Sequence, residues 1–509
     1  KVENGLITPE VLYSFGRIGS VEVSPDKSKM LYQVTYVDIK QNKTNPELFV
    51  MNTDGSDKRQ LTVTNARESN PQWISGGRKI AFLSSESGTS QIWTMNPDGS
   101  GMKKITEVEE GINGFVFSPD NKKILFIKNV KRGESAKERY SDLPEASGRI
   151  VDDLMYKHWD NWVEEIPHTF VADFSDDKVS NIIDLLQDEP YEAPMLPFGG
   201  IEQLAWSPDG KTIAYTSRKK TGKEYAVSTN SDIYFYDVES GKTTNMTAGM
   251  MGYDVNPQFS PDGSKLAWQS MERDGYEADK NRLFVMDLAT GDKMYVTENF
   301  DYNTDAFVWN TDNKTLYIVA CVEAKTQLFS ADIQSKQISP ITKGKHDYAS
   351  VALGNGKLIA KRHSMSQPDE IYAVELTNGQ ATEISFENKH ILEQLILGET
   401  EERWIETTDG KQMLTWVVYP PDFDSTKTYP ALLYCQGGPQ STVSQFWSYR
   451  WNLQIMAANG YIVVAPNRRG LPGFGQEWNE QISGDYGGQN MRDYLSAIDA
   501  LAQEPYVDE

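Results

Sequence analysis

The sequence has few cysteines and no long hydrophobic run. Only two cysteines occur in 509 residues, and each lies in an apolar, strand-like stretch of a different predicted domain. We therefore expect Cys321 and Cys435 to be free, buried thiols rather than a disulfide. No stretch approaches the roughly 18 apolar residues of a membrane-spanning helix. The sequence thus predicts neither a disulfide scaffold nor a membrane span.

Basic residues are scarce relative to acidic ones. Fifty Lys and Arg stand against 73 Asp and Glu, which gives a formal net charge of −23. Because this field repels phosphate backbones, we expect no nucleic-acid partner. A content of 39% hydrophobic and 11% aromatic residues excludes disordered and collagen-like classes. We expect no cofactor and no metal.

The N-terminus lacks an initiator methionine and any visible signal peptide, since the chain begins Lys1-Val-Glu. This start fits a mature exported protein after signal removal, and it equally fits a trimmed chain. We expect a periplasmic or secreted protein, although the sequence leaves a cytoplasmic location open. It also leaves open whether the protein forms a homodimer.

A turn motif recurs through most of the chain. Ser-Pro-Asp and its degenerate copies start 50, 44, 89, 53, 50 and 42 residues apart, at Ser24, Ile74, Ser118, Ser207, Ser260, Asn310 and Ala352. Each copy precedes a short apolar strand and a further pair of strands, which together form a four-stranded antiparallel unit. Seven such units predict an all-β, seven-bladed β-propeller over residues 21–395, after an N-terminal segment of residues 1–20. A β-sandwich with accidental turns is the alternative.

The interval of 89 residues indicates an insert within the third unit. That unit keeps its first strand (123–127) and its closing hairpin (168–177), so the insert covers about 129–167. The segment 156–167 is dense in Trp and carboxylate residues. Long insertions in compact repeats are usually functional loops or disordered segments, and tryptophans argue against disorder. We therefore expect a functional loop.

The repeat ends near residue 395, where the composition changes. Two alternating strands surround Asp409-Gly410, which is a hairpin signal. The apolar strand 431–435 should be buried on both faces, because its apolar positions are consecutive. A second apolar strand and a helix over 490–503 follow. These elements predict the N-terminal part of an α/β-hydrolase domain over residues 396–509.

A glycine-rich loop, Gln436-Gly437-Gly438-Pro439, directly follows the first of these strands. Glycines at this point let backbone N–H groups face a developing oxyanion. A simple tight turn is the alternative. The nucleophile motif of α/β-hydrolases, Gly-x-Ser-x-Gly, does not occur in the 509 residues, and no histidine follows His390.

The order of these modules resembles the prolyl oligopeptidase family of serine peptidases, and within it the acylaminoacyl-peptidase and dipeptidyl-peptidase V branch. The resemblance rests on the Ser-Pro-Asp propeller, the Gly-Gly-Pro loop and the sequence Arg-Gly-Leu-Pro-Gly-Phe-Gly at 469–475. It implies a serine exopeptidase that cleaves short peptides from the N-terminus by acyl transfer. The resemblance places the Ser, Asp and His of its triad beyond Glu509, so the chain alone is expected to be inactive.

The resemblance also implies an oxyanion site and a contact to the substrate in the hydrolase part. The backbone N–H of Gly438 matches the family's oxyanion donor. Gln436 stands where this branch usually has His and the dipeptidyl-peptidase IV branch has Tyr. Arg468 or Arg469 could bind a substrate carbonyl or fix its loop to the propeller.

A second implied site holds the ammonium group of the substrate. Exopeptidases of the family bind it with carboxylates on a propeller insertion, and the candidates here are Glu164, Glu165 and Asp160. Trp159 and Trp162 would add cation–π walls. The alternative is a solvated Glu pair on an insert helix. A non-enzymatic propeller scaffold for protein binding and an esterase with a propeller lid are the competing functions.

Overall fold

The computed structural model describes residues 2–438 and 440–508, so Pro439 of the glycine-rich loop lies outside the described residues. The chain divides into two compact units. Unit 1 comprises Lys1–Arg59, Thr297–Asn310 and Lys314–Glu509, and unit 2 comprises Gln60–Val296 with Thr311–Asn313. Within the described part, no helix is long and apolar enough to cross a membrane.

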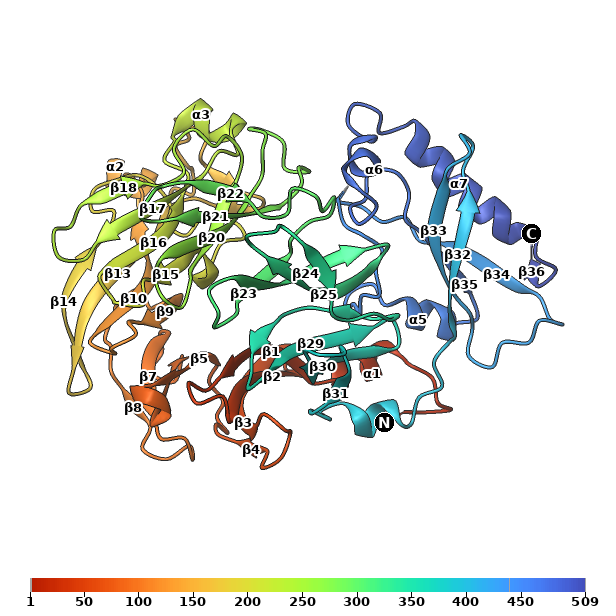
Figure 1. Ribbon diagram of the computed structural model, residues 1–509, viewed down its shortest axis with the longest axis horizontal. Coiled ribbons are helices and arrows are strands. Elements are labelled where there is room, and N and C mark those ends of the chain that lie inside the picture. The colour runs from red at the N-terminus through yellow and green to blue at the C-terminus, as the bar shows by residue number, and fades with distance from the viewer. Residues whose placement is uncertain (1, 439, 509) are drawn as a thin grey trace. The chain divides into compact units, whose positions relative to one another are not determined.

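Seven antiparallel sheets form a seven-bladed β-propeller, which confirms the predicted fold (Figure 1). The first three blades are β1 (Arg17–Val23), β2 (Lys29–Asp38), β3 (Lys43–Asn52) and β4 (Arg59–Gln60); β5 (Glu68–Ile74), β6 (Lys79–Ser84), β7 (Gln91–Met95) and β8 (Lys103–Lys104); and β9 (Gly114–Phe117), β10 (Lys123–Lys131), β13 (Glu165–Ser175) and β14 (Lys178–Asp184).

The remaining four blades follow in chain order. The fourth and fifth are β15 (Leu204–Trp206), β16 (Thr212–Ser217), β17 (Asp232–Asp237) and β18 (Thr243–Asn245); and β19 (Asp254–Phe259), β20 (Lys265–Ser270), β21 (Arg282–Asp287) and β22 (Lys293–Tyr295). The sixth and seventh are β23 (Ala306–Trp309), β24 (Thr315–Val322), β25 (Lys325–Asp332) and β26 (Ile338–Pro340); and β27 (Asp347–Tyr348), β28 (Ala352–Leu353), β29 (Lys357–Ser364), β30 (Gln367–Glu375) and β31 (Ala381–Glu383).

The Ser-Pro-Asp turns close themselves by local hydrogen bonds. In all four copies the Ser hydroxyl donates to the Asp carboxylate over 2.6–2.7 Å and accepts from the backbone N–H five residues later over 2.9–3.0 Å. The residue after the Asp has a positive φ, from 58° at Asn121 to 72° at Gly263. Asn and Gly tolerate this conformation. The motif therefore places the first two strands of a blade side by side without help from distant residues.

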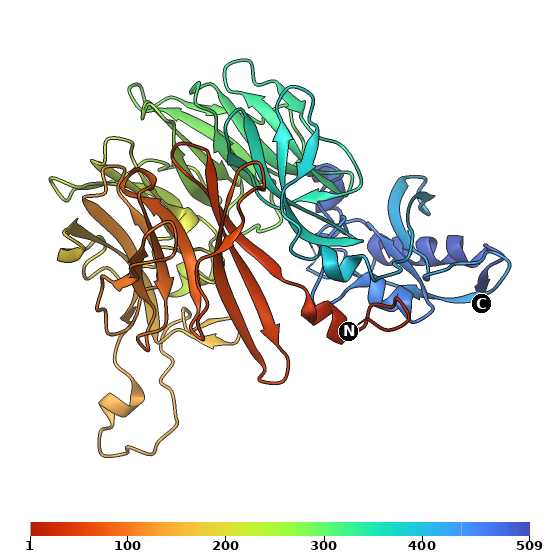
Figure 2. The same ribbon diagram turned by 90° about the horizontal axis from the view of Figure 1, so that it is seen from below.

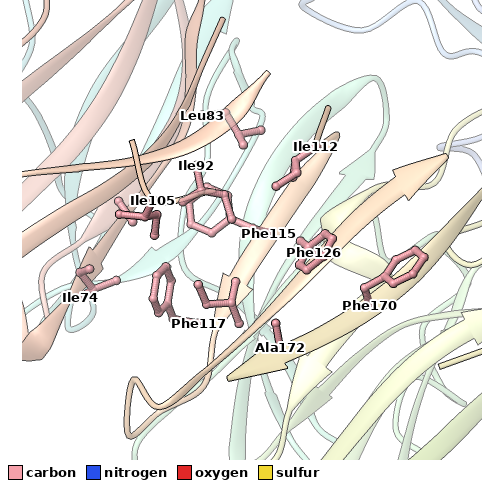
Figure 3. Close-up of a cluster of buried hydrophobic side chains, with 12 residues drawn as sticks. Ile74, Leu83, Ile92, Ile105, Ile112, Phe115, Phe117, Phe126, Phe170 and Ala172 are labelled. Carbon is pink, nitrogen blue, oxygen red and sulfur yellow. The ribbon is translucent and has the colours of Figure 1, made fainter. Parts of the chain in front are cut away.

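The propeller core lies between successive blades. Ile74, Leu83 and Ile92 of the second blade pack against aromatic side chains of the third (Figure 3). Among these, Phe126 and Phe170 stack with ring centroids 5.5 Å apart. The second and third sheets thus bury apolar faces against each other, which one blade could not do alone.

The insert occupies residues 132–164, because β10 and β13 are longer than expected and pair from Lys123↔Asp173 to Lys131↔Glu165. It contains the short helix α2 (Ala136–Arg139) and a two-stranded hairpin of β11 (Lys157–His158) and β12 (Asn161–Trp162). Figure 2 shows the insert extending away from the strands of its own blade.

The hydrolase region forms one five-stranded sheet in the order β32-β33-β35-β34-β36. Its strands are β32 (Thr400–Glu406), β33 (Gln412–Val418), β34 (Tyr429–Leu433), β35 (Ile462–Pro466) and β36 (Val507–Asp508). Strands β34 and β35 are parallel, as in an α/β-hydrolase. The helices outside the insert are α1 (Pro9–Ser14), α3 (Gly222–Val227), α4 (Lys389–Leu392), α5 (Leu453–Ala458), α6 (Gln476–Glu480) and α7 (Gln489–Ala502).

Two burial expectations are wrong, one for strand β34 and one for the cysteines. Strand β35 is buried at every position, but β34 alternates, with Pro430 and Leu432 exposed. The alternate residues of β34 pack on the cluster that includes α7, which covers only one face. The cysteines are both free, as expected, but Cys435 is exposed and Cys321 is half-buried. Cys435 is exposed because it lies in the loop that follows β34 rather than in the strand.

A buried ion cluster connects the seventh blade with the hydrolase region inside unit 1. Asp347 accepts hydrogen bonds from the Thr326 N–H over 2.8 Å and from the Ser444 hydroxyl over 2.5 Å. The ring of His363 lies 2.8 Å from Asp369 and 3.7 Å from Asp347. Although burial opposes its charge, the hydrogen bonds to both carboxylates raise the pKa of His363 to about 9.

This raised pKa predicts a loss of stability at alkaline pH. Since the unfolded histidine titrates near 6.5, the stabilisation is fully present below that pH and disappears as the pH rises through 9. His363→Gln should therefore lower the free energy of unfolding on the order of 3 kcal/mol at pH 6 and by much less at pH 10. Calorimetric unfolding at both values checks this, with the exposed His390→Gln as control. An equal loss at the two pH values would contradict it.

Candidate functional site

The loop after β34 has the backbone that an oxyanion site requires. Gly438 is exposed and has a φ of 127°, a conformation that favours glycine. A Cβ at this position would lie 3.0 Å from the Gln440 backbone nitrogen. Within residues 2–438 and 440–508 the Gly438 amide donates no hydrogen bond. The N–H group is thus available for a ligand.

Gln436 is held by both its carbonyl and its side chain. Its carbonyl oxygen accepts from Arg468 Nη2 over 2.9 Å and from the Tyr494 hydroxyl over 2.8 Å. Its side-chain oxygen accepts from the Tyr434 hydroxyl over 2.8 Å. Its side-chain nitrogen donates to the Gly437 carbonyl over 3.4 Å, which leaves one N–H that Gln436 can offer to a ligand.

Arg468 is buried beside this loop, with 3% of its surface exposed. Besides the Gln436 carbonyl, its guanidinium donates to the Arg469 carbonyl over 2.8 Å and to the Tyr494 hydroxyl over 3.1 Å. Gly470 leaves room for it, because a Cβ there would lie 2.6 Å from Arg468 Nη1. The structure thus places Arg468 where it fixes the glycine-rich loop.

Arg469 binds the hairpin of the sheet to helix α7. Its guanidinium donates to both carboxylate oxygens of Asp409 over 2.6 Å and to Asp493 over 2.9 Å. It also lies over the ring of Trp478, 4.8 Å from the centroid. The hydrogen bonds from Arg469 hold the pKa of Asp409 far below its usual value. Arg469 therefore has a structural role.

The structure brings two of the proposed ammonium-binding residues together around a cation of the chain itself. Glu164 forms an ion pair with Arg149 over 3.0 Å, and the Arg149 guanidinium lies over the Trp162 ring, 4.5 Å from the centroid. Lys157 approaches the same ring at 4.4 Å. Trp162, Glu164 and Arg149 line a cavity of about 540 Å³ within the insert.

The other candidates of the insert lie apart from this group. Glu165 begins β13 and accepts from the Asn129 side chain over 3.3 Å. Trp159 packs edge-on against Phe198, with centroids 4.9 Å apart, and Asp160 is exposed in the hairpin turn. Residues 157–162 form a β-hairpin, so the helix of the alternative reading is not found at these positions.

Sequence reasoning missed Glu192, which is 2% exposed and holds the insert hairpin. Its carboxylate lies 2.7 Å from His158 Nε2 and accepts from the Tyr225 hydroxyl over 2.9 Å. It also missed the role of Tyr494, because a tyrosine on the apolar face of an amphipathic helix looks like an ordinary core residue. Nothing in the sequence near either residue indicates these contacts.

Comparisons with known proteins agree with this architecture. A model described as TolB beta propeller domain matches residues 11–150 and 201–390, and one described as Prolyl oligopeptidase family matches residues 447–509. Dipeptidyl-peptidase 5 of Porphyromonas gingivalis is 55% identical over 502 residues, which cover 99% of this chain and 73% of that protein. Dipeptidyl-peptidase 5 of Porphyromonas endodontalis is 50% identical over 506 residues, with coverage of 99% and 73%.

A solved structure shows the same fold at low sequence identity. The acylaminoacyl peptidase of Pyrococcus horikoshii superposes with a TM-score of 0.79 at 18% identity, and the match covers 99% of this chain and 74% of that one. The likeness extends over both the propeller and the hydrolase region.

Proposed function

The chain belongs to the prolyl oligopeptidase family, and from this premise we propose that it acts in a serine exopeptidase that releases dipeptides from the N-termini of short peptides. The observation that carries the proposal is the 55% identity to a dipeptidyl-peptidase 5 over 99% of the chain. The chain spans 73% of the length of that relative.

The chemistry would be acyl transfer through a Ser–His–Asp triad, which these 509 residues do not let us assign. The part of the machinery that this chain offers is the Gly438 N–H, held on a loop that Arg468 and Tyr494 fix. One such donor contributes roughly 10²- to 10³-fold to kcat in enzymes that form tetrahedral intermediates.

The full-length protein that contains this chain tests the function directly. We expect it to release dipeptides from dipeptidyl amides with a free N-terminus, as detected by mass spectrometry of the products. Release of N-acylated single residues would favour an acylaminoacyl-peptidase instead. Cleavage of short esters with inert amides would favour an esterase. If the protein shows no turnover and is not labelled by a serine-directed fluorophosphonate, the result would favour a non-enzymatic propeller scaffold for protein binding.

We further propose that Glu164 and Trp162 bind the substrate ammonium, since the other candidates, Glu165, Asp160 and Trp159, lie apart from this pair. The support is that Glu164 and Trp162 already surround the guanidinium of Arg149. The geometry thus suits a cation, which would take the place of Arg149. Because Glu164 is 65% exposed, its attraction for a cation is screened by water.

Glu164→Gln should therefore lower kcat/KM for substrates with a free N-terminus about fivefold, which corresponds to about 1 kcal/mol. N-acylated substrates carry no ammonium, so their weaker turnover should change less than twofold. Steady-state kinetics on both substrate types measures the difference. Asp142→Asn, which changes an exposed carboxylate of the same insert outside the cavity lining, is the control. Equal effects on both substrate types would contradict the proposal.

A further inference from the structure

The Gln436 carbonyl is the fixed point of the glycine-rich loop. It receives two hydrogen bonds, from Arg468 Nη2 over 2.9 Å and from the Tyr494 hydroxyl over 2.8 Å. A carbonyl oxygen has two lone pairs, so both are occupied. Because the peptide unit is planar and trans, fixing this carbonyl also directs the N–H of Gly437 away from Arg468 and Tyr494.

This fixation counteracts the freedom of the two glycines that follow. Glycine populates positive and negative φ about equally, so an unrestrained Gly437-Gly438 segment would sample several orientations of its N–H groups. Preorganised donors stabilise a developing oxyanion because they need not reorient during the reaction. A restraint immediately before Gly437 therefore reduces the number of orientations that the Gly438 N–H can adopt.

The restraint is itself held rigidly. Arg468 follows β35 and Tyr494 lies on α7, and both side chains are buried. They bind each other through Arg468 Nε and the Tyr494 hydroxyl over 3.1 Å. Rotation of either side chain would break hydrogen bonds of the other, so the loop, β35 and α7 are fixed together.

Within residues 2–438 and 440–508, Arg468 forms no ion pair with a carboxylate, although Asp409 and Asp493 both pair with the adjacent Arg469. The hydrogen bonds of Arg468 go to two backbone carbonyls and a phenol. A buried guanidinium without an ion pair of its own favours negative charge nearby. The charge thus favours an oxyanion at the loop that the same side chain orients.

We propose that Arg468 and Tyr494 are positioning residues of the oxyanion site, which orient the Gly437-Gly438 segment through the Gln436 carbonyl, and that the charge of Arg468 stabilises the tetrahedral intermediate. This inference rests on the proposed function, because it assumes that the loop serves acyl transfer. It assigns Arg468 to the support of the loop rather than to contact with the substrate.

Three variants of the full-length enzyme separate the two contributions. Arg468→Met removes both the hydrogen bonds and the charge and should lower kcat about 100-fold. Arg468→Lys keeps the charge but not the forked contacts and should lower kcat about tenfold. Tyr494→Phe should lower kcat three- to tenfold. KM should change less than threefold in all of them, because the ground-state substrate does not contact these residues.

A transition-state mimic provides a second measurement. A peptide trifluoromethyl ketone forms an anionic hemiketal with the active serine, so its inhibition constant should rise in parallel with the loss of kcat. Binding of the dipeptide product should not change. Arg492→Met, an exposed arginine on the same helix, is the matched control and should leave both values unchanged.

If one of the Arg468 variants fails to fold, Tyr494→Phe still tests the proposal, because it removes the two hydrogen bonds of the hydroxyl without burying a new charge. Variants that raise KM at unchanged kcat would show that Arg468 binds substrate and would overturn the proposal. Losses no larger than that of Arg492→Met would overturn it as well. A wild-type enzyme that hydrolyses p-nitrophenyl esters but no dipeptidyl amide would refute the proposed substrate class alone, since esters also form an oxyanion. A wild-type enzyme inactive on both would overturn both proposals.

Discussion

Arg469→Met should lower the free energy of unfolding of the hydrolase region by about 3–5 kcal/mol, the usual cost of leaving a buried charge without its partner. Arg469 is 1% exposed and donates to Asp493, which has no exposed surface. Methionine retains much of the volume but offers no donor. The substitution therefore leaves the Asp493 carboxylate buried and short of its strongest partner.

The exposed member of the same cluster provides the control. The side chain of Asp409 is 40% exposed, so Asp409→Asn leaves a polar group that water can reach and should cost about 1 kcal/mol. Hydrogen exchange of the α7 amides, together with calorimetry, reports the loss where Arg469 acts. Equal exchange rates in the two variants would contradict the prediction.

Asn388→Ala should cost roughly 2–6 kcal/mol, because it leaves two buried backbone groups without partners at about 1–3 kcal/mol each. The Asn388 side chain accepts from the Gly16 N–H over 2.8 Å and donates to the Gly16 carbonyl over 2.9 Å. Asn388 has no exposed surface, and Gly16 is buried, so water cannot replace the lost bonds.

Denaturant unfolding of the two alanine variants Asn388→Ala and Asn378→Ala measures this cost. Asn378 is exposed and accepts from the nearby Gln380 N–H, so its loss should cost less than 1 kcal/mol. If the two variants unfold within 1 kcal/mol of each other, the buried pair does not stabilise the fold as argued.

The propeller was predictable because its signal is local. Each Ser-Pro-Asp turn contains both partners of its hydrogen bonds within six residues, so the sequence itself displays the contact. The glycine-rich loop was predictable for the same reason, since Gly438 needs a glycine for its own φ of 127°.

Contacts between distant segments could not be predicted in this way. Arg468 meets Tyr494 across 26 residues, and Glu192 meets His158 across 34. The prediction that β34 is buried on both faces was wrong, because an apolar run shows what a strand can bury but not which elements cover it. Strand β35 has the same character and is buried at all five positions, because Val463 and Ala465 pack on the α5 side of the sheet and Ile462 and Val464 on the α7 side.

The hydrogen bonds between Asn388 and Gly16 also mean that the first blade is synthesised long before its partner in the seventh blade. Among the described residues no strand is shared between the first and seventh blades, so side chains and these backbone contacts join them. Gly16 leaves the ribosome 372 residues before Asn388. At about 5–20 residues per second this interval is roughly 20 to 70 seconds. During this interval Ile18 and Met30 of the first blade lack their packing partners Ile359 and Ile371 of the seventh blade. A chaperone can therefore protect the exposed apolar side chains of the nascent chain for a long period.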